Sequence, residues 1–461
     1  MRRTLGEFAR LAGGRLAGAD RSFTNVVSDT RALKAGELFI ALRGPNFDGN
    51  EFVAAAAAAG AAGALVEREQ PVALAQIVVP DAQAALERAA RAWRAQFSGA
   101  LVGVAGSNGK TTAKEMLAAI LSEAGPTLAT RGNLNNHIGV PLTLLRLTGA
   151  ERFAVVEMGA NRPGEVAHLV DLARPTVGLI TNAGAEHLEG FGSLEGVARA
   201  EGEMVAGLSA SATAVINADD AYAAMWRGST PARVVTFGVA RSADFSASEV
   251  AAAVGSEGFT TSFRLTAPIG AAAIRLKLGG THNVANALAA AASAASAGAG
   301  LEHIVAGLAK VRAVPGRLQF RRAAGGGWLI DDSYNANPSS VRAAIEVLAQ
   351  LPGRRWLVLG DMAELGAGAL EEHVQLGEFA RAHGIERLYA SGPLSARAAG
   401  AFGAGGESFA DVPALAAALR AALGAGETSE VRVLVKGSRF NRLERVVEAV
   451  ASDALPNTGG H

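Results

Sequence analysis

Short apolar runs alternate with amphipathic segments along most of this chain. Apolar runs at residues 101–104, 153–157 and 176–182 are each followed by a stretch with helical spacing, at 113–121, 165–173 and 197–204. Strands that alternate with helices of this length are typical of βαβ units and a parallel sheet. The pattern therefore predicts an α/β fold for the middle of the chain.

The same alternation returns near the C-terminus. Four buried strands are predicted there, separated by helical patterns that include 340–348 and 373–382; the strands are at residues 328–333, 356–361, 388–392 and 431–438. These units predict a Rossmann-like domain. Polar residues lie at or just beyond the predicted strand ends, and we expect them to gather on one edge of the sheet: Asp332, Asn335, Asn337, Asp361, Glu364 and Lys436.

The N-terminal part predicts a smaller α/β unit, with helices at 5–12 and 52–62 and strand-like segments near 26–27, 36–42 and 64–66. A helix at 84–97 leads into the middle part, residues 231–278 alternate like antiparallel strands that extend its sheet, and Pro315-Gly316 forms a natural linker. We therefore expect three domains: 1–82, a small α/β domain; 83–314, a central domain with a parallel sheet; and 315–461, a Rossmann-like domain.

The strongest chemical signal follows the strand at 101–104. It is a loop of small residues that ends in Gly-Lys-Thr-Thr, and its members are Gly106, Ser107, Asn108, Gly109, Lys110, Thr111 and Thr112. Backbone N–H groups of such a loop approach phosphate oxygens, the lysine bridges the terminal phosphates, and the following hydroxyl can bind Mg²⁺. The strict pattern requires a glycine at the position of Val104, so this is a variant phosphate loop. Its flanking strand and helix favour a nucleoside triphosphate site over a plain glycine-rich turn.

Other polar positions are ambiguous when taken alone. Ser28 to Arg31 fit ordinary turn chemistry, and the amide-rich turn at 132–141, with Asn135 and Asn136, could simply form a turn. Glu157 ends a buried strand, where a Mg²⁺-associated acid belongs in a phosphate-loop domain. His187 follows the strand at 176–182, at the edge where open α/β sheets bind ligands. Acids in the helix at 197–204 are expected to be surface charges.

Composition limits the classes of molecule that this protein is expected to bind. Lysine plus arginine and aspartate plus glutamate number 43 each, which argues against nucleic acid or an acidic membrane surface as a partner. Cysteine is absent, which excludes disulfides, thiolate metal sites and cysteine nucleophiles. No apolar run is long enough for a secretion signal or a membrane span, so a cytoplasmic protein is expected. The tail at 455–459 resembles a wall-sorting pentapeptide, but no apolar and basic segment follows it.

Taken together, the ordered motifs resemble those of the Mur ligases. The resemblance covers nearly the whole chain and rests on the segments at 106–112, 133–141, 157–159, 187, 282–286, 316–317, 332–338, 360–366 and 436–439. The Asp-Ser-Tyr-Asn-Ala-Asn segment at 332–337 and the Ser-Asp-Thr-Arg segment at 28–31 resemble the member that adds D-alanyl-D-alanine to a UDP-linked muramyl tripeptide.

This resemblance implies an ATP- and Mg²⁺-dependent ligase of peptidoglycan synthesis that works through an acyl phosphate. We expect it to be cytoplasmic and monomeric. It implies that Lys110 binds phosphates, that Thr111, Glu157 and His187 lie near Mg²⁺, and that Asn283 faces adenine while Arg317 and Asp332 face the ribose. It also implies substrate contacts, with the UDP group held by Ser28, Asp29, Thr30, Arg31 and Asn46, and the peptides near Asn135, Asn136, Asn335, Asn337, Asp361, Glu364, Lys436 and Ser438.

One position departs from the family pattern. Members commonly carry a lysine, carbamylated by CO₂, where this chain has Glu201. We expect Glu201 to supply the negative charge directly, reaching Mg²⁺ through water. Two other functions remain open on the sequence: a ligase of the same build that adds a single amino acid, or glutamate to a folate, and a non-catalytic protein that binds a wall precursor under nucleotide control.

Overall fold

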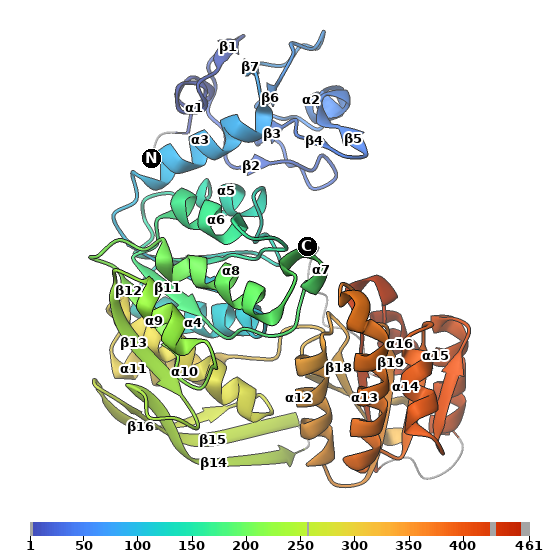
Figure 1. The fold of residues 1–461 in the computed structure, drawn as a ribbon. Helices are drawn as coiled ribbons and strands as arrows, with labels where there is room; N and C mark the ends of the chain where they lie inside the picture. Colours follow the sequence, from blue (N-terminus) through green and yellow to red (C-terminus); the bar gives the residue numbers. More distant parts are fainter. Residues whose placement is uncertain (1–2, 256–257, 425–429, 453–461) are drawn as a thin grey trace.

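The computed structural model describes residues 3–255, 258–424 and 430–452, and the tail motif at 455–459 lies outside the described residues. Three large sheets follow one another along these residues (Figure 1), and a hairpin at 43–48 forms a fourth, two-stranded sheet. The α/β class predicted from the sequence is confirmed, with a parallel sheet at the centre. The domain boundaries at 82/83 and 314/315 stay predictions, because α3 begins at Ala82 and packs against both α1 and α5.

The first sheet has the order β1-β7-β6-β3-β2, and only β1 pairs antiparallel. Its elements are α1 (Leu5–Ala12), β1 (Arg15–Ala17), β2 (Val26–Val27), β3 (Leu38–Ile40), the hairpin β4 (Arg43–Gly44) and β5 (Phe47–Asp48), η1 (Gly49–Phe52), α2 (Val53–Ala58), β6 (Gly63–Val66), β7 (Gln76–Val78) and α3 (Ala82–Arg94). The helix predicted at 52–62 was too long. It ends at Ala58 because the chain turns at Gly60, which has φ 83°.

The central sheet has the order β16-β15-β14-β13-β12-β11-β8-β10-β9. Its elements are β8 (Ala100–Ala105), α4 (Lys110–Ala124), β9 (Thr127–Ala129), α5 (Gly139–Leu144), β10 (Phe153–Glu157), α6 (Glu165–Ala173), β11 (Val177–Ile180), α7 (Leu188–Phe191), α8 (Leu194–Ala206), β12 (Thr213–Asn217), α9 (Ala223–Ser229), β13 (Arg233–Gly238), β14 (Phe245–Gly255), β15 (Gly258–Ala267), β16 (Gly270–Leu276), α10 (Thr281–Ser296) and α11 (Leu301–Lys310). The antiparallel extension is confirmed for β14 to β16, but β13 pairs parallel with both neighbours.

Strand β8 explains why this sheet holds two layers of helices. Leu101 and Ala105 point into one apolar core, whereas Val102 and Val104 on alternate positions point into the core on the opposite face. A strand buried on both faces reads as a continuous apolar run, as this one does. The loop that follows β8 therefore leaves the sheet at a rigid, central position.

The third sheet has the order β17-β18-β22-β19-β20-β21, with β17 antiparallel and the others parallel. Its elements are β17 (Gln319–Arg322), η2 (Ala324–Gly326), β18 (Trp328–Asp332), α12 (Pro338–Ala349), β19 (Arg354–Gly360), η3 (Gly366–Gly368), α13 (Ala369–Ala382), β20 (Arg387–Ser391), α14 (Ser395–Phe402), β21 (Gly406–Phe409), α15 (Val412–Gly424), β22 (Val431–Lys436), η4 (Arg439–Asn441) and α16 (Glu444–Val450). The edge strands β17 and β21 were not predicted, because they are short and only partly buried.

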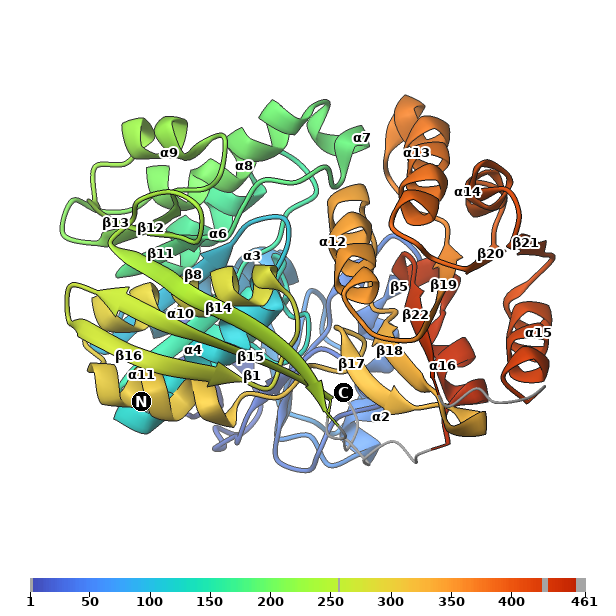
Figure 2. The same ribbon diagram turned by 90° about the horizontal axis from the view of Figure 1, so that it is seen from below.

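The third domain faces the central domain through α12, which lies on the side of the third sheet toward the central domain in both views (Figures 1 and 2). A second bridge is aromatic: Phe259 at the start of β15 meets Phe320 of β17 edge-to-face at 4.8 Å. No helix within the described ranges is long and apolar enough to cross a membrane.

Candidate active site

A cavity of about 1270 Å³ lies between the central and third domains. Its walls include the whole loop from Ser107 to Thr112, the end of β10, the segment after β11, and the ends of β18 and β22. The carboxyl ends of parallel strands from two sheets therefore face one another across this space. Open α/β sheets bind ligands at such edges.

The phosphate loop has the conformation that its glycines allow. Gly106 has φ 119° and Gly109 has φ 81°, and both values disfavour any residue with a side chain. Space excludes a side chain as well, because a Cβ on Gly106 would collide with the Thr181 hydroxyl and one on Gly109 with the Asn286 amide. Helix α4 then begins at Lys110 with its N-terminal amides at the cavity. This geometry suits a phosphate group.

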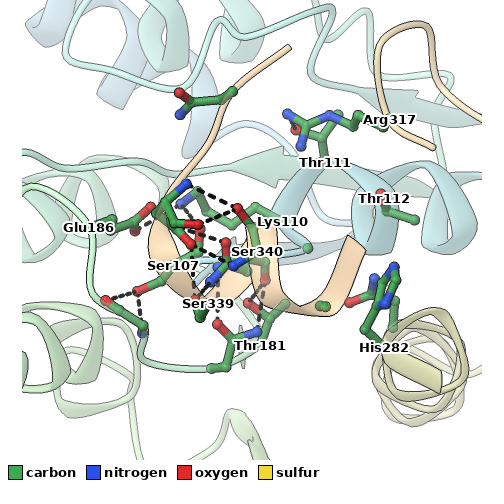
Figure 3. Close-up of a pocket in the computed structure, with 18 of the residues that line it drawn as sticks. Ser107, Lys110, Thr111, Thr112, Thr181, Glu186, His282, Arg317, Ser339 and Ser340 are labelled. Atoms are coloured by element: carbon green, nitrogen blue, oxygen red, sulfur yellow. Dashed lines mark hydrogen bonds and ion pairs between the residues drawn. The ribbon is translucent and has the colours of Figure 1, made fainter. Parts of the chain in front are cut away.

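Lys110, the first residue of α4, places its ammonium group beside this loop (Figure 3). Its Nζ donates to the carbonyls of Gly106 and Ser107 and lies 3.4 Å from a Glu186 carboxylate oxygen. Burial on its own would lower the pKa of Lys110, but the carboxylates of Glu186, Glu201 and Glu157 together raise it. Burial also raises the pKa of Glu186. Lys110 is therefore cationic, and its ammonium group is paired with two loop carbonyls and with Glu186.

Two of the three residues predicted near Mg²⁺ have suitable oxygen atoms at the cavity. The Thr111 hydroxyl accepts a hydrogen bond from Arg317 at 3.0 Å, and Glu157 Oε1 accepts one from Asn135 at 2.9 Å. Glu157 Oε2 is buried and has no hydrogen-bond partner, which is a costly arrangement unless a cation or water satisfies it. Among the described residues no cluster of three or more His, Asp or Glu could hold a metal alone. Mg²⁺ binds through few protein oxygens and several waters, so these residues fit it.

His187, the third residue predicted near Mg²⁺, lines the cavity but is engaged across the domain interface. Its Nδ1 contacts the carboxylate of Glu364, and the Glu189 amide donates to the Glu364 carbonyl at 3.4 Å. Both His187 and Glu364 have positive φ values, 47° and 63°, which few residues other than glycine adopt. The structure therefore places His187 at a contact between domains as well as at the cavity.

Third-domain residues complete the cavity wall. Lys436 Nζ lies 2.5 Å from Asp332 and donates to the Asn335 carbonyl at 3.0 Å. The Arg317 guanidinium stacks over the Tyr334 ring at 4.4 Å, and in Figure 3 it lies beside Thr111. Asp332 Oδ1 also accepts the Leu318 amide, so part of its hydrogen-bonding capacity is used within the domain.

Asn337 and Asn108 join the two domains directly. The Asn337 amide donates to Asn108 Oδ1 at 2.8 Å, and the Asn108 amide donates to the Ser339 hydroxyl at 3.1 Å. Asn337 also caps α12 by accepting the Ser340 amide at 2.9 Å. The phosphate loop is thereby hydrogen-bonded to the start of α12.

Two asparagines at the cavity form hydrogen bonds with other protein groups. Asn283 is buried and donates to the Gly279 carbonyl at 2.7 Å, while its own oxygen accepts from Asn286 at 3.1 Å. Asn136 accepts the amides of Ile138 and Gly139 at the start of α5. Their predicted contacts with adenine and with peptide stay predictions.

Several predicted residues do not line this cavity. Asp361 is buried and its carboxylate accepts the amides of Leu394 and Ser395, at the start of α14. The Ser438 hydroxyl donates to the Ala336 carbonyl and accepts the Ala363 amide. Gly106, Glu201 and Glu364 do not line the cavity either. The other members of this group belong to the first domain, in the loop after β2 and in the β4–β5 turn: Ser28, Asp29, Thr30, Arg31 and Asn46. Arg31 forms a 2.7 Å ion pair with Asp29, which lies across an exposed turn.

The expectation that the acids of α8 are surface charges is wrong for Glu201. Glu201 is completely buried, its Oε2 accepts the Gly106 amide at 2.6 Å, and its Oε1 has no hydrogen-bond partner. Burial raises the pKa of Glu201 to about 7, although Lys110 and the hydrogen bond from the Gly106 amide lower it. It contacts the phosphate loop from behind and does not line the cavity.

Three sequence signatures match consecutive parts of this chain: the Mur ligase family, catalytic domain at residues 22–98, the Mur ligase middle domain at 104–294, and the Mur ligase, glutamate ligase domain at 316–439. The chain is 47% identical over 449 residues to the UDP-N-acetylmuramoyl-tripeptide–D-alanyl-D-alanine ligase of Escherichia coli, and the match covers 97% of this chain and 98% of that relative. The chain belongs to the Mur ligase family.

Other relatives and solved structures support membership of this family. The ligase of the same name from Mycobacterium tuberculosis is 35% identical over 507 residues, with 98% of each chain covered. The crystal structure of MurF from Acinetobacter baumannii superposes with a TM-score of 0.89 at 34% identity, covering 97% and 98% of the two chains. MurF from Thermotoga maritima, solved in complex with ADP, gives 0.79 at 28% identity, covering 92% and 96%. A folylpolyglutamate synthase at 18% identity shares the fold alone.

Sequence reasoning missed one buried charged residue beside the site of this Mur ligase. Lys114 lies one helical turn beyond Lys110 and is completely buried against the segment that carries Asn135. The spacing of four residues on one helix face was the available signal. It was not decisive, because a lysine in an amphipathic helix is usually exposed.

Proposed function

We propose that this Mur ligase joins D-alanyl-D-alanine to UDP-N-acetylmuramoyl-tripeptide, using ATP with Mg²⁺, in peptidoglycan precursor synthesis. The observation that carries the proposal is the meeting of Lys110, Thr111 and Glu157 at one cavity whose opposite wall is the third domain. Relatives that cover almost the whole chain and are named for this reaction support it.

The reaction has two steps whose needs match this cavity. A carboxylate of the tripeptide takes the γ-phosphoryl group of ATP and becomes an acyl phosphate, with ADP as the leaving group. The amine of D-alanyl-D-alanine then attacks the acyl carbon, loses a proton, and phosphate leaves as the amide forms. Both steps bring anions together, so neutralisation and alignment are the main tasks of the protein.

The chain divides these tasks among its own residues. The loop amides and Lys110 hold the phosphates, while bound Mg²⁺ neutralises developing charge and would be held by Thr111 and Glu157. Asp332 and Arg317 approach the nucleotide from the third domain, and Asn337 closes that domain onto the loop. A closed interface excludes water, which would otherwise hydrolyse an acyl phosphate.

The roles of the more distant residues belong to the same proposal. Ser28, Asp29, Thr30, Arg31 and Asn46 would hold the UDP group on the first domain, and Asn135, Asn335 and Lys436 would contact the peptides. The protein would act in the cytoplasm as a monomer. A chain without a membrane-spanning helix in its described residues and without net charge fits this setting.

The test is a ligation assay with ATP, the UDP-linked tripeptide and D-alanyl-D-alanine in the presence of Mg²⁺. Phosphate release should require D-alanyl-D-alanine, and mass spectrometry should show the joined pentapeptide product. Phosphate release with single amino acids, or with glutamate and a folate, would favour the sibling activities instead. Nucleotide binding with no joined product would identify a precursor-binding protein and refute the proposal.

A further inference from the structure

Lys114 is a completely buried cation beside the active site, and the mechanism above does not use it. It lies on α4 but does not line the cavity. Its Nζ donates to the carbonyls of Thr130 and Gly132 at 3.0 and 3.3 Å, lies 2.9 Å from Glu115, and lies 3.8 Å from Glu157 Oε2. A buried charge is retained only where its surroundings satisfy it.

The groups that Lys114 contacts belong to one network around Glu157. The Thr130 hydroxyl accepts the Glu157 amide at 3.0 Å, which fixes the end of β10. Asn135 donates to Glu157 Oε1 at 2.9 Å, and its carbonyl accepts the Gly159 amide at 2.9 Å. Lys114 therefore fixes both ends of this arrangement, the turn at residues 130–136 and the carboxylate that the turn supports.

The orientation of Glu157 matters because its two carboxylate oxygens have different surroundings. Asn135 donates a hydrogen bond to Oε1, while Oε2 is buried without a hydrogen-bond partner and lies 3.8 Å from Lys114 Nζ. Loss of a group that hydrogen-bonds or orients a metal-binding side chain typically lowers metal affinity about 10- to 100-fold.

We propose that Lys114 is a positioning residue: it ties α4 to the turn at 130–136 and thereby holds the Glu157 carboxylate in place at the cavity for a divalent cation. This inference rests on the proposed function for the identity of the cavity, and it assigns to the chain a residue that acts through Glu157 rather than by touching a substrate.

Charge and position make opposite predictions for Lys114. If Lys114 acted only as a nearby positive charge, its removal would strengthen binding of a divalent cation, because like charges repel. If it positions Glu157, its removal weakens binding, because the turn and the carboxylate lose their common anchor. The direction of the change therefore decides between the two roles.

The experiment measures Mn²⁺ binding by electron paramagnetic resonance in the full-length protein saturated with ADP. Lys114→Met keeps the length of the side chain and removes its charge and hydrogen bonds, and we expect Mn²⁺ binding to weaken about tenfold or more. Lys114→Arg restores donors and charge and should recover most of this loss. Glu115→Gln is the matched control, since Glu115 is the exposed partner, and should leave Mn²⁺ affinity unchanged within about twofold.

A second variant keeps the inference testable if Lys114→Met does not fold. Thr130→Val removes the hydroxyl that accepts the Glu157 amide and preserves the side-chain shape, and we expect Mn²⁺ binding to weaken about threefold. In ligation assays the folded variants should lose kcat with little change in KM for ATP. Unchanged or tighter Mn²⁺ binding in a folded variant overturns the inference. Failure of the wild-type protein to form the joined product would refute the proposed function separately.

Discussion

Replacing Glu201 with glutamine should make this Mur ligase more stable and less active. Glu201 is completely buried behind the phosphate loop, and its pKa is about 7 in the folded protein against an ordinary value of 4.5. The groups that face it are Lys110, which favours the charged form, and Glu186 and Glu203, which oppose it. The folded protein therefore binds this proton more tightly than the unfolded chain does.

The sign of the pH dependence follows from this difference. Because the folded state binds the proton more tightly, the contribution of Glu201 to stability falls as the pH rises from about 4.5 to about 7. One pKa unit corresponds to about 1.4 kcal/mol, so ionisation of Glu201 costs ~1 kcal/mol of stability at pH 5.5 and ~3 kcal/mol at pH 8. Glutamine does not titrate and carries no such cost.

Urea unfolding at pH 5.5 and pH 8 tests this reasoning. The difference in the free energy of unfolding between Glu201→Gln and wild type should grow by ~2 kcal/mol in favour of the variant as the pH rises. The glutamine amide can also change stability in a way that does not depend on pH, for example by forming a new hydrogen bond where Oε1 has none. Such an effect contributes equally to the free energy of unfolding at both pH values and cancels in the comparison. Glu195→Gln, on the exposed face of the same helix, is the control and should show no growth. An equal difference at both pH values would refute the argument.

Activity should change in the opposite direction. Glu201 accepts the Gly106 amide and is one of the carboxylates that keep Lys110 cationic, so we expect Glu201→Gln to lower kcat by about tenfold. The rate of the wild-type enzyme should not depend on bicarbonate, because the carboxyl group of Glu201 belongs to the side chain and is not formed from CO₂. Glu201→Lys should become bicarbonate-dependent. Normal activity of Glu201→Gln would remove Glu201 from the catalytic machinery.

Three further substitutions test the site. Lys110→Ala should reduce ligation by at least about 1000-fold, measured as joined product, because it removes the phosphate-binding cation; full-speed dipeptide addition would contradict the ATP-site assignment. Gly109→Ala should abolish ATP binding in a calorimetric titration, because its Cβ would collide with Asn286 at φ 81°; normal affinity would show that the loop adapts. Asn337→Ala should raise KM for ATP several-fold in steady-state kinetics with a smaller change in kcat, because it removes the 2.8 Å bond to Asn108; an unchanged KM would show that this bond does not support closure.

Local patterns determined most of the elements. The apolar run before the phosphate loop, the helix after it and the strand that ends at Glu157 were predicted from alternation and periodicity, and the structure has them as β8, α4 and β10. These features depend on neighbours in sequence, which is why a single chain reveals them. Gly109 and Lys110 carried the phosphate chemistry for the same reason, since their roles need only one turn of backbone.

Tertiary structure alone decided the electrostatics and the partners. Glu201 belongs to a helix whose sequence suggests an exposed face, yet packing places it behind Gly106 with a raised pKa. Lys114 is buried only because the turn at 130–136 folds over it, and Asn108 meets Asn337 across 229 residues of chain. Burial and long-range contact set pKa values and hydrogen-bond partners, and neither is encoded in the periodicity of one segment. The sequence by itself thus determined which chemical groups the site contains, and the packing of three domains determined which of them act together.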